Sequence, residues 1–164
     1  MTVAELNGLS VAGFVEQVGW VVEHSPWVAE RAALQRPFAN RDELLRALVA
    51  QLEAATRDKQ LAVLRAHPDL GARARMSDAS VGEQAGVGLD RLTPEEFGRL
   101  QRLNSAYKER FGFPFLYAVK GSTKYAILEA LEERLRQAPE VEFAEALRQV
   151  ARIVGFRISE SVGG

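Results

Sequence analysis

Three ionisable side chains occur at positions where the surrounding sequence gives no structural reason for a charge. His67 follows a predicted helix and precedes Pro68. Because histidine titrates near neutral pH, this residue could act as a general acid or base. Glu83 lies sixteen residues further on, within the glycine-containing stretch SVGEQ at 80–84, where a hydroxyl, a carboxylate and an amide occur together. With Arg157, these residues suggest cofactor-free acid–base chemistry on a small anion.

Arg157 is the most informative of the three because of its place on the last predicted helix. A helix advances about 100° per residue, which puts Arg157 about 20° from Val150 and about 40° from Ile153, inside the apolar stripe. A guanidinium stays charged in proteins and is costly to bury without a partner, so we expect it to meet a carboxylate. That partner could be a structural ion pair or an anionic ligand held by a bidentate clamp; fraying of the helix end into solvent is a further alternative.

The other candidate residues also have structural explanations. His67 could be a helix cap or a satisfied core group, and Glu83 one more solvated carboxylate. Gln84 could lie on the surface at a helix start. The aromatic segment around Phe113 and Phe115 could simply be core, or its extended backbone could offer N–H and C=O groups to a flat polar heterocycle.

Composition excludes several classes of function. The 164 residues contain no cysteine, which rules out disulfides, thiolate nucleophiles and cysteine-bound metals, and two histidines are too few for a histidine-rich metal cage. A net charge of −1 lacks the basic excess of a nucleic-acid binder, so we expect no nucleic-acid partner. We also expect no membrane span, no bound metal and a cytoplasmic location.

Helical periodicity dominates the chain and indicates the fold class. We expect helices over about 10–24, from 25–27 onward, from 40 or 41 to about 52, over 57–65, over 93–111, from 122 or 123 to about 137, and from 139 to about 158. Thr93-Pro-Glu-Glu96 predicts a capping box at the start of the fifth of these. The prediction is an all-α, compact single-domain bundle of about seven to eight helices covering residues 1–164.

Two stretches depart from the helical pattern. Residues 67–92 contain four glycines and small polar residues, which predicts an extended loop with room for one helical turn around 82–86. Residues 111–122, FGFPFLYAVKGS, are aromatic and β-branched but interrupted by Pro114 and Gly121. They predict a buried extended segment that belongs to no sheet.

Several motifs together resemble one known family. They are HPDLG at 67–71, S-x-x-E-Q at 80–84, LTPEEFGRLQRLNSAYKERFGFPFLYAVKG at 92–121, EHSPWVAERA at 23–32 and FRI at 156–158. The sequence resembles OHCU decarboxylase, the enzyme of urate degradation that acts on 2-oxo-4-hydroxy-4-carboxy-5-ureidoimidazoline. The resemblance covers essentially the whole chain.

The resemblance implies a residue-by-residue assignment of the site. His67 would be the catalytic histidine, Glu83 the catalytic glutamate and Arg157 the family's arginine. One departure from the family pattern is the Gly155-Phe156 pair just before Arg157, which could let the end of the helix bend. The substrate would be lined by Pro68, Ser80, Val81, Gly82, Glu83, Gln84, Phe115, Leu116, Tyr117, Ala118, Val119 and Arg157.

The resemblance also implies an activity and partners. The expected reaction is decarboxylation of the anionic ureidoimidazoline to (S)-allantoin without a cofactor. Urate oxidase and hydroxyisourate hydrolase are the expected pathway neighbours, and a homodimer is one expected assembly. Two alternatives stand beside it. One is a J-domain-like co-chaperone, because a helix ends in HPD; the other is a helical binding module without catalysis.

Overall fold

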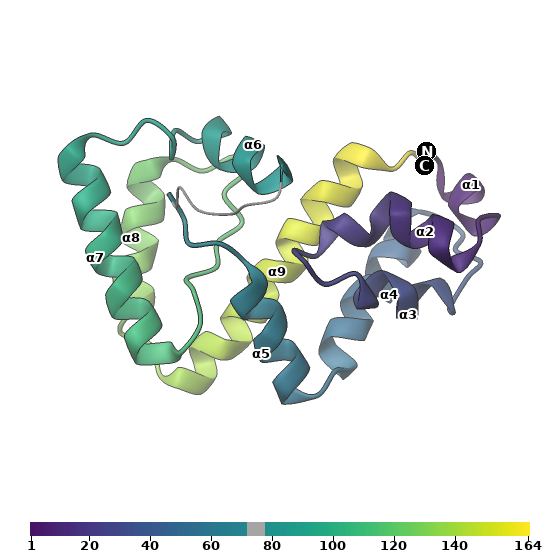
Figure 1. Ribbon diagram of the computed structural model, residues 1–164, viewed down its shortest axis with the longest axis horizontal. Helices are drawn as coiled ribbons and strands as arrows, with labels where there is room; N and C mark the ends of the chain where they lie inside the picture. The colour runs from purple at the N-terminus through teal and green to yellow at the C-terminus, as the bar shows by residue number, and fades with distance from the viewer. Residues whose placement is uncertain (72–77) are drawn as a thin grey trace. The chain divides into compact units, whose positions relative to one another are not determined.

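The fold is all-α, as predicted. The computed structural model describes residues 1–71 and 78–164, which form nine α-helices, one 3₁₀ turn (η1, Gly19–Val21) and a single isolated β-bridge (Figure 1). The helices are α1 (Val3–Asn7), α2 (Val11–Val18), α3 (Trp27–Ala33), α4 (Arg41–Ala54), α5 (Arg57–Ala66), α6 (Asp78–Gly86), α7 (Pro94–Phe111), α8 (Lys124–Arg134) and α9 (Pro139–Ser161). Eight of them have seven residues or more, in agreement with the expected seven to eight.

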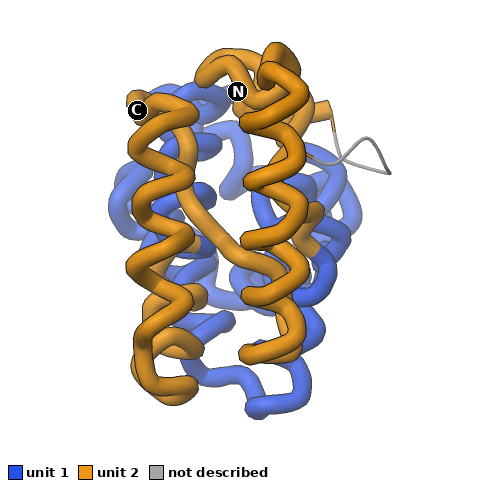
Figure 2. Tube along the Cα trace, turned by 90° about the vertical axis from the view of Figure 1, so that its left-hand side faces the viewer, with its two compact units in different colours: residues 1–66, 150–164 blue, residues 67–149 orange. Residues whose placement is uncertain are grey.

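The chain divides into two compact units, coloured separately in Figure 2. Unit 1 consists of residues 1–66 and 150–164, and unit 2 of residues 67–149. Helix α9 therefore contributes residues to both. The single domain expected over 1–164 stays a prediction. No helix in the described ranges is both long enough and apolar enough to cross a bilayer.

Unit 1 is built on helices whose starts are capped by short polar side chains. Thr2, Ser10 and Asn40 each accept a backbone N–H from the first turn of α1, α2 and α4, which satisfies donors that a helix start leaves unpaired. The two ends of the described chain meet in this unit: Val3 donates its N–H to the carbonyl of Gly163 at 3.1 Å. The core of the unit is apolar and mostly aliphatic, and it includes Leu6, Phe14, Val18, Val28, Leu44, Leu48, Val63, Leu64, Val154 and Ile158.

Unit 2 is organised around α7 and α8, which lie alongside each other and run in the same direction (Figure 1). The capping box predicted at Thr93 and Glu96 is present, and α7 ends at Phe111, followed by the capping residue Gly112, whose φ is 81°. Because the next helix has the same direction, residues 112–123 must travel back along the pair. They do so as the extended, buried segment that the sequence predicts, and Figure 2 shows it as a diagonal connection.

The prediction of a loop over 67–92 is wrong for residues 78–86, which form helix α6. The expected single turn around 82–86 is the second half of a longer helix. Ser80 and Gln84, one helical turn apart, are buried. A Cβ at Gly82 or Gly86 would meet nothing within 4 Å, so both glycines face open space and leave the buried side intact. The low helix propensity of these glycines hides the helix in the sequence.

Candidate functional site

His67 begins unit 2, directly after the last residue of α5. Only 6% of the residue is exposed, so the imidazole lies largely away from water. Pro68 follows it, which agrees with the expectation that α5 ends before this proline. Residues 67–71 have no regular secondary structure up to the turn at 70–71, and their position depends on the side chains that hold them.

Helix α6 carries the S-x-x-E-Q motif. Ser80 and Gln84 are each 5% exposed, Glu83 is half-buried, and Val81 is 49% exposed. The alternative that Gln84 lies on the surface is therefore excluded. Val81 and Gly82, both predicted to line the substrate, lie on the solvent-facing side of the helix.

A hydrogen bond ties α6 to the segment that carries His67. Gly71 donates its N–H to the Oε1 atom of Gln84 at 2.8 Å. The φ of Gly71 is 72°, and a Cβ at this position would lie 2.6 Å from Leu100 Cδ2. Glycine is needed here because the backbone is left-handed and because it approaches α7 closely. The HPDLG and S-x-x-E-Q motifs are thus joined directly within unit 2.

The extended segment Phe115–Val119 is the third part of the predicted site, and it is held by side chains rather than by a sheet. Ala118 donates its N–H to Gln149 Oε1 at 2.9 Å, and Leu116 accepts a hydrogen bond at its carbonyl from Arg134. Buried backbone groups outside regular structure need such partners. The ring of Phe115 is fully buried, and the guanidinium of Arg134 lies 4.5 Å from its centroid.

A buried cluster of three polar side chains, Tyr107, Arg134 and Glu142, holds this segment through Arg134. Arg134 Nε and Tyr107 Oη each donate to Glu142 Oε1 at 2.5 Å. Glu142 is fully buried, and the side chain of Arg134 is 12% exposed. Burial, followed by the hydrogen bond to Glu142, raises the pKa of Tyr107 far above its usual range. The phenol therefore stays a donor at any physiological pH.

Arg157 belongs to unit 1, whereas the other predicted site residues belong to unit 2. It is 2% exposed, as its place in the apolar stripe predicts, and its expected carboxylate partner is Glu23, with Nη2 and Oε1 3.3 Å apart. Its Nη1 also donates to the carbonyl of Val21 at 3.2 Å. The structural ion pair foreseen as one alternative exists, and a frayed helix end is excluded because α9 continues to Ser161.

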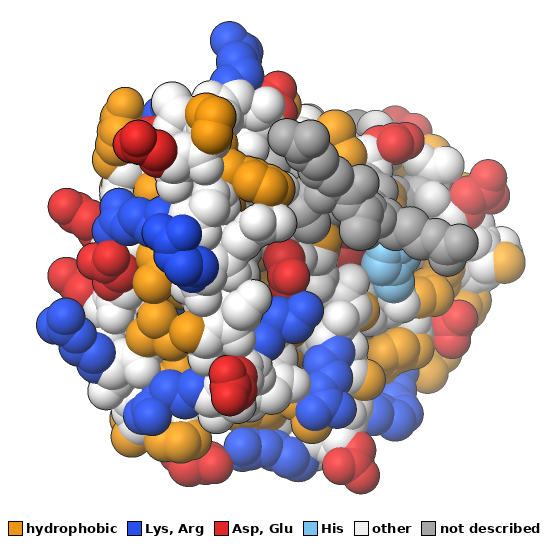
Figure 3. Space-filling model, turned by 60° about the vertical axis from the view of Figure 1, so that its left-hand side comes forward, with side chains coloured by type: hydrophobic (Ala, Val, Ile, Leu, Met, Phe, Trp, Pro, Cys, Tyr) orange, Lys and Arg blue, Asp and Glu red, His pale blue; other side chains and the backbone are white. Residues whose placement is uncertain are grey.

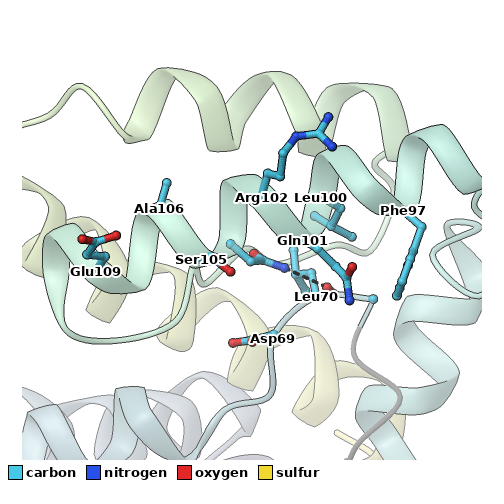
Figure 4. Close-up of a pocket in the computed structure, with 11 residues that line it drawn as sticks. Asp69, Leu70, Phe97, Leu100, Gln101, Arg102, Ser105, Ala106 and Glu109 are labelled. Carbon is cyan, nitrogen blue, oxygen red and sulfur yellow. Dashed lines mark hydrogen bonds between the residues drawn. The ribbon is translucent and has the colours of Figure 1, made fainter.

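An open hollow of about 820 Å³ lies beside the HPDLG segment in unit 2. Figure 4 shows Asp69 and Leu70 on one side and α7 residues such as Gln101 and Ser105 on the other. None of the predicted substrate-lining residues borders it. On the face drawn in Figure 3, acidic and basic side chains are interspersed rather than gathered by sign.

Metal ligation finds no support in the described ranges, where no group of three or more histidine, aspartate and glutamate side chains could hold an ion.

Four residues that hold these segments were not singled out in the sequence: Asn104, Arg134, Glu142 and Gln149. Asn104 could have been found by the argument used for Arg157, because it lies about 40° from Leu100 on the apolar face of α7. It is 6% exposed and donates Nδ2 to the carbonyl of Leu70 at 3.0 Å. The other three occur among charged residues typical of a solvated helix face and carry no such signal.

Comparison with known proteins gives consistent results. Residues 7–159 match the family model of OHCU decarboxylase. The 2-oxo-4-hydroxy-4-carboxy-5-ureidoimidazoline decarboxylase of Haloferax volcanii is 48% identical over 160 residues, which cover 98% of this chain and 95% of that protein. The uric acid degradation bifunctional protein PucL of Bacillus subtilis is 41% identical over 161 residues, which cover 98% of this chain but 33% of PucL.

Two solved structures have the same fold. A crystal structure of (S)-allantoin synthase matches with a TM-score of 0.82 and 32% identity, over 99% of this chain and 54% of that one. A crystal structure of OHCU decarboxylase in the presence of (S)-allantoin matches with a TM-score of 0.69 and 23% identity, over 82% of this chain and 89% of that one. At that identity, the second match supports the fold alone.

Proposed function

The chain belongs to the OHCU decarboxylase family, and from this membership we propose that it is a carboxy-lyase that converts 2-oxo-4-hydroxy-4-carboxy-5-ureidoimidazoline to (S)-allantoin. The observation that carries the proposal is the near full-length match to decarboxylases of this name. The co-chaperone is not favoured, because the similarity extends far beyond the HPD tripeptide. The non-catalytic binding module is not favoured, because the full-length relatives are named as decarboxylases.

The substrate can serve as its own electron sink. One ring carbon bears the carboxylate and a hydroxyl, and the neighbouring carbon is an imine. When the bond to CO₂ breaks, its electron pair forms a C=C bond to the imine carbon, and the imine nitrogen takes up a proton. The hydroxyl then loses its proton and becomes a carbonyl, while the former imine carbon gains a proton on one face. This chemistry does not need the electron sink that pyridoxal phosphate or thiamine supplies elsewhere.

His67 is the group we assign to proton transfer, with Glu83 assisting or orienting it. The burial of His67 supports this role, because a site that excludes bulk water can direct the proton to one face of the ring. The hydrogen bond from Gly71 to Gln84 supports a joint role, since it links the segment of His67 to the helix of Glu83.

Arg157 would bind a ring or ureido oxygen that gains negative charge as CO₂ leaves. A direct pair with the substrate carboxylate would stabilise the ground state and slow the reaction unless it strengthened in the transition state. We therefore prefer that the carboxylate faces a less polar wall. The guanidinium is already oriented by Glu23 and the carbonyl of Val21, which would fix its direction before substrate binds.

The remaining contacts would come from Pro68, Ser80, Val81, Gly82, Gln84 and the segment Phe115–Val119. Within that segment the N–H of Ala118 and the carbonyls of Leu116 and Val119 already have partners. The heterocycle would therefore use other backbone groups of the segment.

A coupled assay tests the function. Urate oxidase and hydroxyisourate hydrolase generate the substrate, and circular dichroism follows the chirality of allantoin. We expect (S)-allantoin to form faster than the spontaneous reaction; racemic product at the spontaneous rate would refute the proposal. His67→Asn should lower kcat by about 10²–10⁴-fold, which is typical for a lost acid–base group. His24→Asn is the matched control, because His24 is the other histidine of the chain and its side chain is 58% exposed.

We also propose the coarser features of its setting: one functional domain over residues 1–164, a cytoplasmic location, a homodimer, and urate oxidase and hydroxyisourate hydrolase as neighbouring enzymes. The match to one third of a bifunctional uric acid degradation protein supports the last point. Sedimentation of the purified protein would test the homodimer, and a monomer at the assay concentration would contradict it.

A further inference from the structure

One face of α7 holds the segment that follows His67, residue by residue. Lys108 Nζ lies 3.2 Å from Asp69 Oδ2, Asn104 Nδ2 lies 3.0 Å from the carbonyl oxygen of Leu70, and Leu100 packs against Gly71. These three α7 residues are spaced four apart and so share one side of the helix. The segment therefore lies along α7 in the opposite direction to the helix.

The three contacts differ in what they can fix. The side chains of Lys108 and Asp69 are 51% and 33% exposed, and an ion pair of this kind imposes little on the backbone. Leu100 gives packing without direction. The bond from Asn104 is buried and directional, and it reaches a backbone carbonyl three residues after His67. In Figure 4 a dashed line beside Leu70 marks this bond.

Stability alone does not explain why position 104 is an asparagine. Its Oδ1 atom is buried without a hydrogen-bond partner in the described part of the chain. A buried amide that is only half satisfied costs free energy, which an apolar residue of the same size would avoid. What the asparagine supplies is a buried donor to the carbonyl of Leu70.

We propose that Asn104 is a positioning residue for His67. By fixing the carbonyl of Leu70, it holds the 67–71 segment so that the imidazole of His67 keeps one orientation toward the reacting atoms. Gln84, which accepts from Gly71 on the other side, then aligns α6 with the same segment. This inference rests on the proposed role of His67. It assigns a function in catalysis to α7, a helix that contains none of the predicted substrate-lining residues.

The test compares Asn104→Leu, which keeps the size but removes the donor, with Asn104→Gln, which keeps an amide donor, and with Ser105→Ala, an exposed neighbour on the same helix. We expect Asn104→Leu to lower kcat by about 10–100-fold, as misplacement of a catalytic group by about 1 Å can do, with KM changed less than about twofold. Its thermal midpoint should stay near that of the wild type. Asn104→Gln should retain more of kcat, and Ser105→Ala all of it.

A second readout does not depend on turnover. The chain has two histidines, so the imidazole signals of His67 and His24 can be assigned by NMR with one variant of each. Asn104→Leu should shift the signals of His67 and leave those of His24, in unit 1, unchanged. A folded variant with wild-type kcat, or with unchanged His67 signals, overturns the inference, as does a loss of kcat that disappears once activity is expressed per folded molecule.

The two proposals can fail separately. If the wild-type protein forms no (S)-allantoin, the proposed function fails, and the NMR comparison still decides whether Asn104 orients His67. If Asn104→Leu does not fold, the same measurements on Asn104→Ala decide the question.

Discussion

Removing the charge of Glu142 should destabilise unit 2 more than any surface ion pair does. In Glu142→Gln the side-chain oxygen can still accept from Tyr107, but the guanidinium of Arg134 loses its carboxylate. Arg134 cannot be neutralised, and at 12% exposure it has little access to water. Breaking a buried ion pair by removing one partner costs about 3–5 kcal/mol.

That free energy corresponds to a measurable change in thermal stability. For a chain of this length, the entropy of unfolding converts 3–5 kcal/mol into a fall of about 9–15 °C in the thermal midpoint. Glu132→Gln is the matched control, because Glu132 pairs with Arg99 on the surface of the same unit, where the side chains of Arg99 and Glu132 are 41% and 45% exposed. An exposed pair is worth about 0.2–1 kcal/mol.

Differential scanning calorimetry of the wild type, Glu142→Gln and Glu132→Gln at pH 7 measures the fall in the thermal midpoint. Chemical denaturation gives an independent value, since unchanged m with a lower midpoint marks a true loss of stability. Equal midpoints for Glu142→Gln and Glu132→Gln would refute the reasoning that the cluster of Tyr107, Arg134 and Glu142 is buried and charged. Activity should fall with the same variant, because Arg134 also holds the carbonyl of Leu116.

Three further predictions concern unit 2. Gly71→Ala should destabilise the protein by about 1–2 kcal/mol, the cost of a left-handed residue with a Cβ, and urea denaturation would show it; an unchanged midpoint would contradict the close approach to Leu100. Because the pKa of Tyr107 is raised, the contribution of this tyrosine to stability is complete below pH 10, the usual value, and is lost at higher pH. In alkaline unfolding curves, Tyr107→Phe should therefore lose stability less steeply above pH 10 than the wild type does. Parallel curves for the variant and the wild type would count against this prediction. The hydrogen bond from Lys124 lowers the pKa of Glu96, so the contribution of Glu96 to stability is present above pH 4.5 and is lost as the pH falls. Glu96→Gln should weaken the acid dependence of the thermal midpoint, whereas identical pH profiles of the variant and the wild type would contradict the pairing.

Local signals in the sequence were sufficient for most of the helices. The capping box at Thr93 and Glu96 is a contact between neighbours in the chain, and the structure contains it as predicted. Helix α6 was missed because glycine and short polar side chains obscure its period, and α1 because five residues are too few to show one. In both cases tertiary packing outweighs a weak local preference.

Long-range partners were the part of the site that the sequence could not supply. The stripe position of Arg157 predicted a carboxylate, but Glu23 is 134 residues away, and nothing local identifies it. An extended segment over 111–122 was predicted from its composition, yet its anchors Arg134 and Gln149 occur among charged residues that look solvent-exposed. Burial of single polar groups depends on the fold and becomes visible only in three dimensions.

The pairing of the chain ends has a practical consequence for protein engineering. Thr2 and Gly163 form a bridge within unit 1, so a short linker could join the ends at small entropic cost. A circular permutant opened between residues 66 and 67 would then read through residues 67–149, followed by 150–164, the linker and 1–66. In that order each compact unit would be encoded without interruption, which would allow the folding of the two to be followed separately along a single polypeptide.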